Sequence, residues 1–224
     1  MELNSTIISS VNQGVEIFED SIISDSGLEW IPINYEEIQG FALRAFFHRI
    51  HPSNKISGNL PIGEEVISKW WGLPIDYRPT DLEEIPAQWN QYERKDYLRR
   101  QALVALLELL AESAKDGVKM RVCSAFRGGE KQRTLYLAAI DRDGCAQRYS
   151  APPGHSEHQL GTCVDLVDIA EEHLYKESFN DCPEGQWLEQ NAHRFGFRRT
   201  YKPTNVDQTG YISEPWHWRF WGKS

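Results

Sequence analysis

The sequence lacks three features that would place it in a specialised class of protein. It contains no run of about 18 apolar residues, so no membrane-spanning helix is predicted. Its four cysteines form no CxxC pair, which argues against a cysteine-rich zinc finger. Its 24 basic residues are outnumbered by 33 acidic ones, and no basic patch with interleaved aromatic residues appears. Nucleic acid is therefore a poor candidate for a partner.

What is present is typical of a globular protein, with 40% hydrophobic and 25% charged residues. The acidic excess lies in residues 1–90, which hold 14 acidic and 5 basic side chains, and we interpret it as a solvated surface. Residues 1–14 mix polar and apolar side chains, so no export signal is visible. The cysteines are expected to be free thiols. As written, the chain would be cytoplasmic, but the sequence leaves its compartment open.

The pattern of apolar residues predicts an α+β fold with few, short strands. Helices are expected at 35–50, 62–71, about 93–115, 130–140 and 186–195, and strands at 118–126, 162–167 and 216–221. Residues 1–34 are interpreted as weakly structured or strand-like, and residues 72–86 as a linker. We therefore expect an N-terminal extension over residues 1–90, a second domain over residues 91–224, and a monomer.

Reactive side chains are concentrated in three segments. These are Ser124-Ala-Phe-Arg127-Gly-Gly-Glu-Lys-Gln132, Gly154-His-Ser156-Glu-His158-Gln-Leu-Gly161-Thr-Cys-Val-Asp165 and Glu214-Pro-Trp-His217-Trp-Arg219.

In the second segment, Gly161 permits a sharp reversal between His158 and the strand that carries Asp165. A carboxylate inside an apolar strand is costly to bury unless it is paired or bound to a metal. In the third segment, Pro215 excludes a helical HExxH motif and could supply a bend between Glu214 and His217. Two imidazoles and one carboxylate would leave the fourth position of a catalytic zinc ion open.

Together these segments resemble the signatures of the VanY-type D-alanyl-D-alanine carboxypeptidases, zinc metallopeptidases of the LAS superfamily. The family's Ser-x-His-x-x-Gly-x-x-x-Asp motif is matched by Ser156, His158, Gly161 and Asp165, and its Glu-Pro-Trp-His motif is intact at 214–217. An upstream Ser-x-x-Arg with a following Gln is matched by Ser124, Arg127 and Gln132. The resemblance covers about residues 98–221 and implies a small antiparallel sheet flanked by helices.

By position, the resemblance implies zinc bound by His158, Asp165 and His217, with Glu214 as general base and acid. It further implies that Arg127 contacts the carbonyl or carboxylate of the substrate, and that Ser156, Gln132 and Ser124 belong to the substrate site. The expected substrate is a peptidoglycan stem peptide or its precursor. The sequence departs from the family at Gly128, where Ser is common, and at Thr162-Cys163.

Several alternatives stay open. Cys163, two residues from Asp165, could face the metal as a fourth ligand or form an oxidation-sensitive site, and His155 could support a ligand. Instead of removing a terminal D-alanine, the enzyme could be an L,D- or D,D-endopeptidase of the endolysin kind. The same scaffold could also be a zinc-containing module that binds peptides without cleaving them.

Overall fold

A computed structural model describes residues 16–17, 23–25, 28–35, 38–43, 49–50, 54, 58–69, 71–144 and 147–223. The chain divides into two compact units, Met1–Phe47 and His48–Ser224. In unit 1 the backbone of four strands is described: β1 (Glu16–Ile17), β2 (Ile23–Asp25), β3 (Leu28–Tyr35) and β4 (Ile38–Leu43). Cys145 lies outside the described residues.

The strands of unit 1 form an antiparallel sheet in which β3 pairs with β1, β2 and β4. The helix expected over residues 35–50 is therefore wrong, since residues 38–43 are a strand. The apolar spacing in this stretch is helical, but local spacing does not fix the structure of so short a segment. Pairing with β3 from Tyr35↔Ile38 to Trp30↔Leu43 decides between them.

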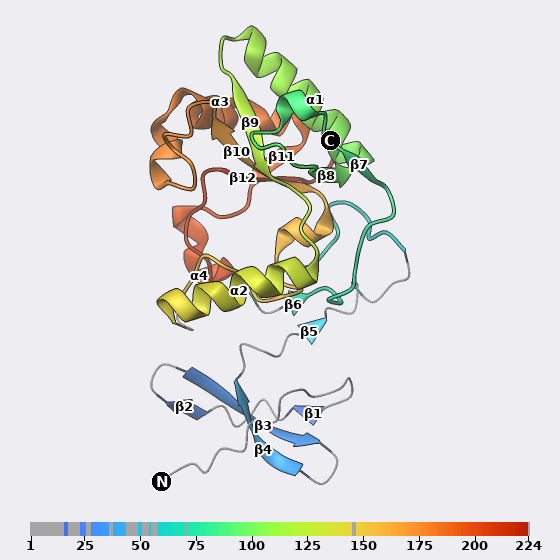
Figure 1. Ribbon diagram of the computed structural model, residues 1–224, viewed down its shortest axis with the longest axis vertical. Helices are drawn as coiled ribbons and strands as arrows, with labels where there is room; N and C mark the ends of the chain where they lie inside the picture. Colours follow the sequence, from blue (N-terminus) through green and yellow to red (C-terminus); the bar gives the residue numbers. More distant parts are fainter. Residues whose placement is uncertain are drawn as a thin grey trace. The chain divides into compact units, whose positions relative to one another are not determined.

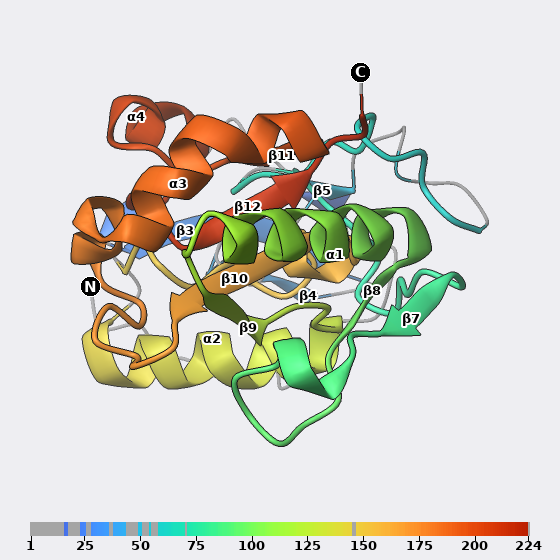
Figure 2. The same cartoon turned by 90° about the horizontal axis from the view of Figure 1, so that it is seen from above.

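The main sheet of unit 2 consists of four antiparallel strands in the order β11-β12-β10-β9. Their bounds are Phe197–Arg199, His217–Phe220, Cys163–Asp168 and Met120–Ser124, respectively. Helices α1 (Arg100–Lys115) and α3 (Pro183–Asn191) lie on one side of this sheet, and α2 (Gly129–Asp143) lies on the other (Figure 1). Seen from the side of α1 and α3, β10 and β12 run beneath these two helices (Figure 2). This is the expected α+β arrangement.

The hydrophobic core lies between the sheet and α1 and α3. Leu106, Leu109 and Leu110 of α1 pack in one cluster with Val164 and Trp218 of the sheet. Because side chains alternate along a strand, the residues next to Val164 and Trp218 face the other side of the sheet. That second face carries polar side chains, and it is the face on the side of α2.

The residues interpreted as a linker within the expected N-terminal extension pack into unit 2. Leu73 and Ile85 are fully buried, so the stretch interpreted as a linker belongs to the packed structure. The division between the units falls after residue 47, whereas the sequence placed a domain boundary after residue 90. Residues 62–69 form turns and bends rather than the expected helix.

Short elements complete unit 2. They are β5 (Arg49–Ile50), β6 (Trp71–Gly72), β7 (Leu82–Glu84), β8 (Tyr97–Arg99) and α4 (Val206–Thr209), with 3-10 turns η4 (Ala87–Trp89), η5 (Glu157–Leu160), η6 (Glu177–Asp181), η7 (Ala192–Phe195) and η8 (Pro203–Asn205). Helix α1 begins at Arg100, seven residues later than expected, because residues 97–99 pair with β7 as a strand.

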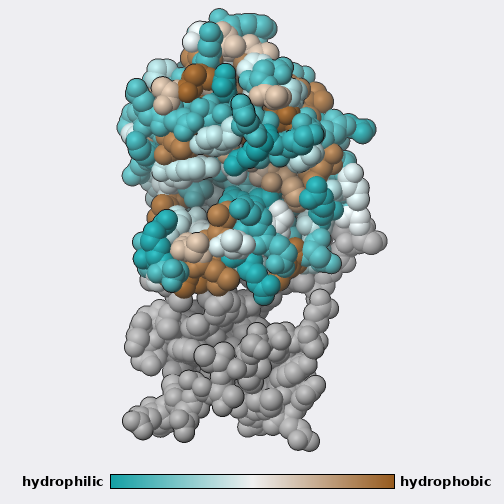
Figure 3. Space-filling view, in the orientation of Figure 1, coloured by the Kyte–Doolittle hydropathy of each residue, from teal (hydrophilic) through white to brown (hydrophobic). Residues whose placement is uncertain are grey.

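Among the described residues, no helix is long and apolar enough to cross a membrane. Hydrophilic residues predominate on the face of unit 2 that Figure 3 shows, and hydrophobic ones lie in scattered patches.

Candidate active site

The polar face of the sheet brings Asp165 and His217 together. Asp165 on β10 is the cross-strand partner of His217 on β12, and Cys163 is the partner of Arg219. Cys163 and Asp165 are two positions apart on β10, and His217 and Arg219 are two positions apart on β12. Because side chains alternate along a strand, all four residues lie on the same face of the sheet. Cross-strand partners have Cβ atoms about 5 Å apart, so the pairing alone places the carboxylate beside the imidazole.

His158 reaches the same point from the turn before β10. It lies in η5, which ends at Gly161 in the left-handed conformation with φ +73°. This conformation favours glycine, and it reverses the chain as the sequence predicted. The Nδ1 of His158 lies 2.7 Å from the carbonyl oxygen of Ala125. A carbonyl only accepts, so Nδ1 carries the proton and Nε2 is left with its lone pair.

The three side chains form a compact group that could hold a metal ion. One ligand atom from each of His158, Asp165 and His217 lies within 4.8 Å of the others. The Nε2 of His158 is 3.2 Å from one oxygen of Asp165, and the Nδ1 of His217 is 3.1 Å from the other. All three side chains are at most 6% exposed. Two nitrogens and one oxygen converging in a buried space fit the ligand set of catalytic zinc.

The electrostatics of this group favour a cation. Burial opposes the ionisation of Asp165, but the imidazoles of His158 and His217, which lie against its two oxygens, hold its pKa well below the usual range. Burial lowers the pKa of His158 and keeps this imidazole neutral, which is the form that binds metals. Burial lowers the pKa of His217, but its hydrogen bond with Asp165 and other contacts raise this pKa well above its ordinary value. The group therefore contains an ionised carboxylate between two imidazoles.

Glu214 lies beside this group without belonging to it. Its carbonyl oxygen accepts a hydrogen bond from the backbone N–H of His217 at 3.2 Å, closing a turn at Pro215 and Trp216. This is the bend that the sequence predicted. Burial raises the pKa of Glu214 to about 8, while the charge of His217 lowers it and that of Asp165 raises it. A divalent cation nearby would favour its ionised form.

Arg127 also lies near the group, and its charge lowers the pKa values of both His158 and Glu214. Its backbone N–H donates to the carbonyl of His158 at 3.1 Å, which holds the turn after β9 against η5. Its Nε is buried and has no hydrogen-bond partner among the described residues. A buried donor without a partner is costly, which makes it a candidate for binding a substrate oxygen.

The remaining predicted substrate residues lie on neighbouring elements. Ser124 is the partner of Asp165 in the β9–β10 ladder, and Ser156 is buried immediately before η5. Gln132 of α2 is buried and donates to the carbonyl of Ala151 at 2.6 Å, while its Oε1 has no partner in the described part of the chain. Their roles in substrate binding stay predictions.

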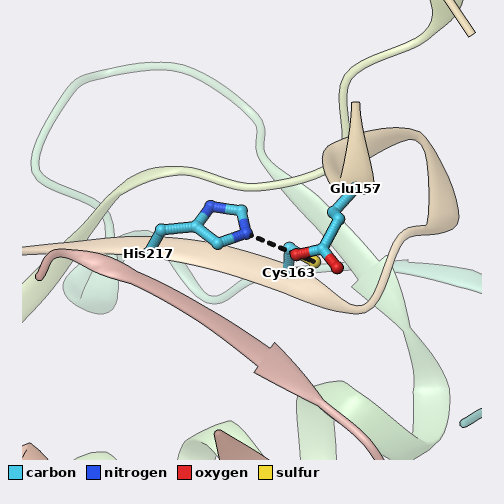
Figure 4. Close-up of side chains that lie close together, drawn as sticks. All are labelled: Glu157, Cys163 and His217. Carbon is cyan, nitrogen blue, oxygen red and sulfur yellow. Dashed lines mark hydrogen bonds and ion pairs between the residues drawn. The ribbon is translucent and has the colours of Figure 1, made fainter. Parts of the chain in front are cut away.

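Cys163 and His155 do not join the group of His158 and Asp165. The thiol of Cys163 lies with Glu157 and His217 in a second group (Figure 4), which shares His217 with the first, and it is 3.9 Å from the Glu157 carboxylate. The Nδ1 of His155 lies 2.7 Å from the carbonyl oxygen of Ser68. His155 therefore anchors the segment before β6.

Glu157 and Arg219 were not singled out from the sequence. Glu157 Oε2 lies 2.9 Å from His217 Nε2, and Glu157 Oε1 accepts from Arg219 at 2.7 Å. A signal was present, since Arg219 stands two positions beyond His217 in a strand of aromatic residues. Tyr201 was also missed, and its ring centroid lies 5.0 Å from that of His217.

The fold and this group of side chains define a metallopeptidase type of domain. The chain belongs to the family described as VanY, D-alanyl-D-alanine carboxypeptidase, whose match covers residues 95–223. It is similar to a D-alanyl-D-alanine carboxypeptidase of Enterococcus faecalis, with 32% identity over 153 residues, 62% of this chain and 55% of the relative. YodJ of Bacillus subtilis is 30% identical over 162 residues, 70% of this chain and 59% of YodJ.

Two solved structures resemble the fold. The LD-carboxypeptidase LdcB gives a TM-score of 0.67 at 29% identity, covering 80% of this chain and 87% of LdcB. The D,D-pentapeptidase VanY, in complex with Zn(II), gives a TM-score of 0.55 at 28% identity, covering 72% of this chain and 89% of VanY. The chain spans only 38% to 59% of the length of the curated relatives that it matches.

Proposed function

We propose that this protein is a zinc-dependent D-alanyl-D-alanine carboxypeptidase that removes the terminal residue of peptidoglycan stem peptides or their precursors. The observation that carries the proposal is the buried convergence of His158, Asp165 and His217 beside Glu214. A relative named D-alanyl-D-alanine carboxypeptidase and a VanY structure in complex with D-alanine-D-alanine support this choice of substrate.

His158, Asp165 and His217 would hold the zinc ion. When bound, zinc supplies a Lewis acid that activates water and polarises the scissile carbonyl at neutral pH. The carboxylate of Glu214 would take a proton from the attacking water and deliver it to the nitrogen of the departing D-alanine. This role requires a carboxylate that binds no metal itself, and Glu214 lies outside the ligand group.

Arg127 would bind the substrate. Its buried Nε, which has no partner in the described part of the chain, lies near the carboxylate of Glu214, and a guanidinium pairs well with a carboxylate. A carboxypeptidase must recognise the free terminal carboxylate of its substrate, whereas an endopeptidase must not. The presence of a cation close to Glu214 favours the carboxypeptidase.

A second candidate substrate differs in the residue before the scissile bond. The fold also resembles that of the LD-carboxypeptidase LdcB, with a TM-score of 0.67 at 29% identity, so cleavage after an L-centre is the second candidate. A stem tetrapeptide ends in an L,D bond and a pentapeptide ends in a D,D bond. The two peptides therefore separate the candidates.

The test is a digest of three synthetic stem peptides by zinc-loaded protein, followed by mass spectrometry. Release of D-alanine from the pentapeptide supports the proposal, and release from the tetrapeptide alone supports the L,D alternative. The third peptide, a pentapeptide with an amidated C-terminus, should be cleaved poorly by a carboxypeptidase. Bound zinc without cleavage of any peptide would instead indicate a non-catalytic peptide-binding module.

A further inference from the structure

A continuous series of buried charged contacts extends from His217 away from the metal ligands. The Nε2 of His217 lies 2.9 Å from one oxygen of Glu157, as the dashed line in Figure 4 shows. The other oxygen of Glu157 accepts from Arg219 at 2.7 Å, and Arg219 donates to Glu65 at 3.0 Å. None of these side chains is more than 3% exposed.

We propose that Glu157 is a positioning residue that fixes the tautomer and orientation of His217, and that Arg219 and Glu65 hold Glu157 in place. This inference rests on the proposed zinc site. It concerns residues that bind neither metal nor substrate but that determine how well His217 serves as a ligand.

An imidazole keeps a single proton when its other nitrogen binds a metal. A carboxylate accepts hydrogen bonds, so Glu157 keeps the proton of His217 on Nε2. The Nδ1 lone pair then points to Asp165, 3.1 Å away, where the metal would lie. With the proton on Nδ1 instead, His217 could not bind a metal through the nitrogen that faces Asp165. Glu157 thus fixes the position of the proton on His217, just as the carbonyl of Ala125 fixes the position of the proton on His158.

Glu157 itself needs support because an isolated buried carboxylate is costly. Arg219 supplies an opposite charge and stacks over the ring of Trp221, with 3.9 Å from the guanidinium carbon to the ring centroid. A planar guanidinium suits such a site because its donors are held in a fixed arrangement. It forms one hydrogen bond to each of two carboxylates, Glu157 and Glu65.

The outer end of the series comes from a part of this chain outside the family match. Glu65 lies 30 residues before the match begins at residue 95. Its Oε2 also accepts from the backbone N–H of Gly63 at 2.7 Å. The segment before the matched domain therefore contributes, through Arg219, to the orientation of a metal ligand.

The same geometry argues against a second metal ion at Glu157, Cys163 and His217, although their ligand atoms also lie within 4.8 Å of one another. Both oxygens of Glu157 already accept hydrogen bonds. A cation there would have to displace the proton of His217 and lie beside the positive charge of Arg219. The inference thus predicts one zinc ion per chain.

The experiment compares zinc dissociation constants of the parent protein, Glu157→Gln and Glu65→Gln by competition with a chromogenic chelator. Glu112→Gln is the matched control, because Glu112 is paired with Lys115 on the surface of α1. Loss of an outer partner typically weakens metal binding about 10- to 100-fold. We expect this loss for Glu157→Gln, a smaller one for Glu65→Gln, and none for the control.

A second readout distinguishes positioning from a general effect on folding. In the zinc-loaded parent, long-range proton–nitrogen NMR of His217 should show the Nε2–H tautomer with a strongly deshielded proton. In Glu157→Gln this proton should move upfield, because a neutral amide is a weaker acceptor.

The outcomes are separable. An unchanged zinc affinity in folded Glu157→Gln, or two zinc ions in the parent, would overturn the inference. If Glu157→Gln does not fold, Glu65→Gln decides: several-fold weaker binding supports the inference, and parental affinity refutes it. A parent protein that binds no zinc would instead refute the proposed metal site itself.

Discussion

Asp165 and His217 are 52 residues apart in the sequence and lie directly opposite each other on β10 and β12, with their side chains 3.1 Å apart. Hydrogen bonding between these two central strands therefore determines the distance between two of the three proposed ligands. A ligand pair held by a sheet is placed more precisely than one on loops. His158 is the exception, and the carbonyl of Ala125 restrains it.

Replacing Glu214 tests the proposed division of roles between ligands and base. Glu214→Gln keeps the size of the side chain but cannot accept a proton, so we expect turnover to fall about 10²- to 10⁴-fold. Zinc content should stay at one ion per chain, because Glu214 is outside the ligand group. Steady-state kinetics with metal analysis measures both, and Glu130→Gln on the exposed surface of α2 is the control. Parental turnover in Glu214→Gln would assign the base to another residue.

Replacing Arg127 tests the recognition of the terminal carboxylate. Arg127→Met removes a buried donor that has no partner among the residues the structure describes, and we expect kcat/KM for a free-acid peptide to fall about 10²- to 10³-fold. Arg133→Met removes an arginine with 59% exposure from α2, the helix that follows Arg127, and should have no effect. Against the amidated peptide, Arg127→Met should lose little further activity. An equal loss on both peptides would place Arg127 at the scissile carbonyl instead.

Much of the site could be predicted from the sequence because its motifs are local. The Ser-x-His-x-x-Gly-x-x-x-Asp spacing requires a turn followed by a strand, and Gly161 with φ +73° forms this turn. The proximity of His217 could not follow from spacing, because it depends on the pairing of β10 with β12. The family resemblance supplied that long-range information.

Other parts were missed because tertiary contacts decide them. Residues 38–43 have apolar positions compatible with a helix, yet pairing with β3 makes them a strand. Leu73 and Ile85 lie in a proline-containing stretch that looks like a linker, but both are fully buried. Glu65 and Glu157 were missed since the partner of a buried carboxylate can be 154 residues away, as Arg219 is from Glu65.

The raised pKa of Glu214 predicts a pH-dependent stability of the metal-free protein. Burial raises this pKa from 4.5 to about 8, so between these values the folded protein holds a proton that the unfolded chain releases. The parent therefore loses stability as pH rises through this window, by at most about 1.4 kcal/mol per pH unit. The neutral side chain of Glu214→Gln does not titrate.

We therefore expect the metal-free Glu214→Gln variant to gain stability relative to the parent between pH 4.5 and pH 8. Urea unfolding at pH 5, 6.5 and 8, in the presence of a chelator, measures the difference. A gain that is the same at all three pH values would show that the carboxyl group titrates normally.

Cys163 provides the last prediction, because the sequence left it as a possible ligand or oxidation site. It is fully buried, and burial together with the charge of Glu157 raises the pKa of its thiol to about 11. A thiol pKa two units above the ordinary value of 9.0 means about 100-fold less thiolate at neutral pH, and the thiolate is the reactive form.

In the native protein at pH 8, iodoacetamide should therefore leave Cys163 unmodified, whereas in denaturant it should react fully. Peptide mapping by mass spectrometry measures this, and Cys163→Ala should still bind one zinc ion because the thiol lies apart from His158 and Asp165. Rapid alkylation of the native protein would instead make Cys163 a reactive, oxidation-sensitive thiol, and loss of zinc from Cys163→Ala would place this sulfur at the metal.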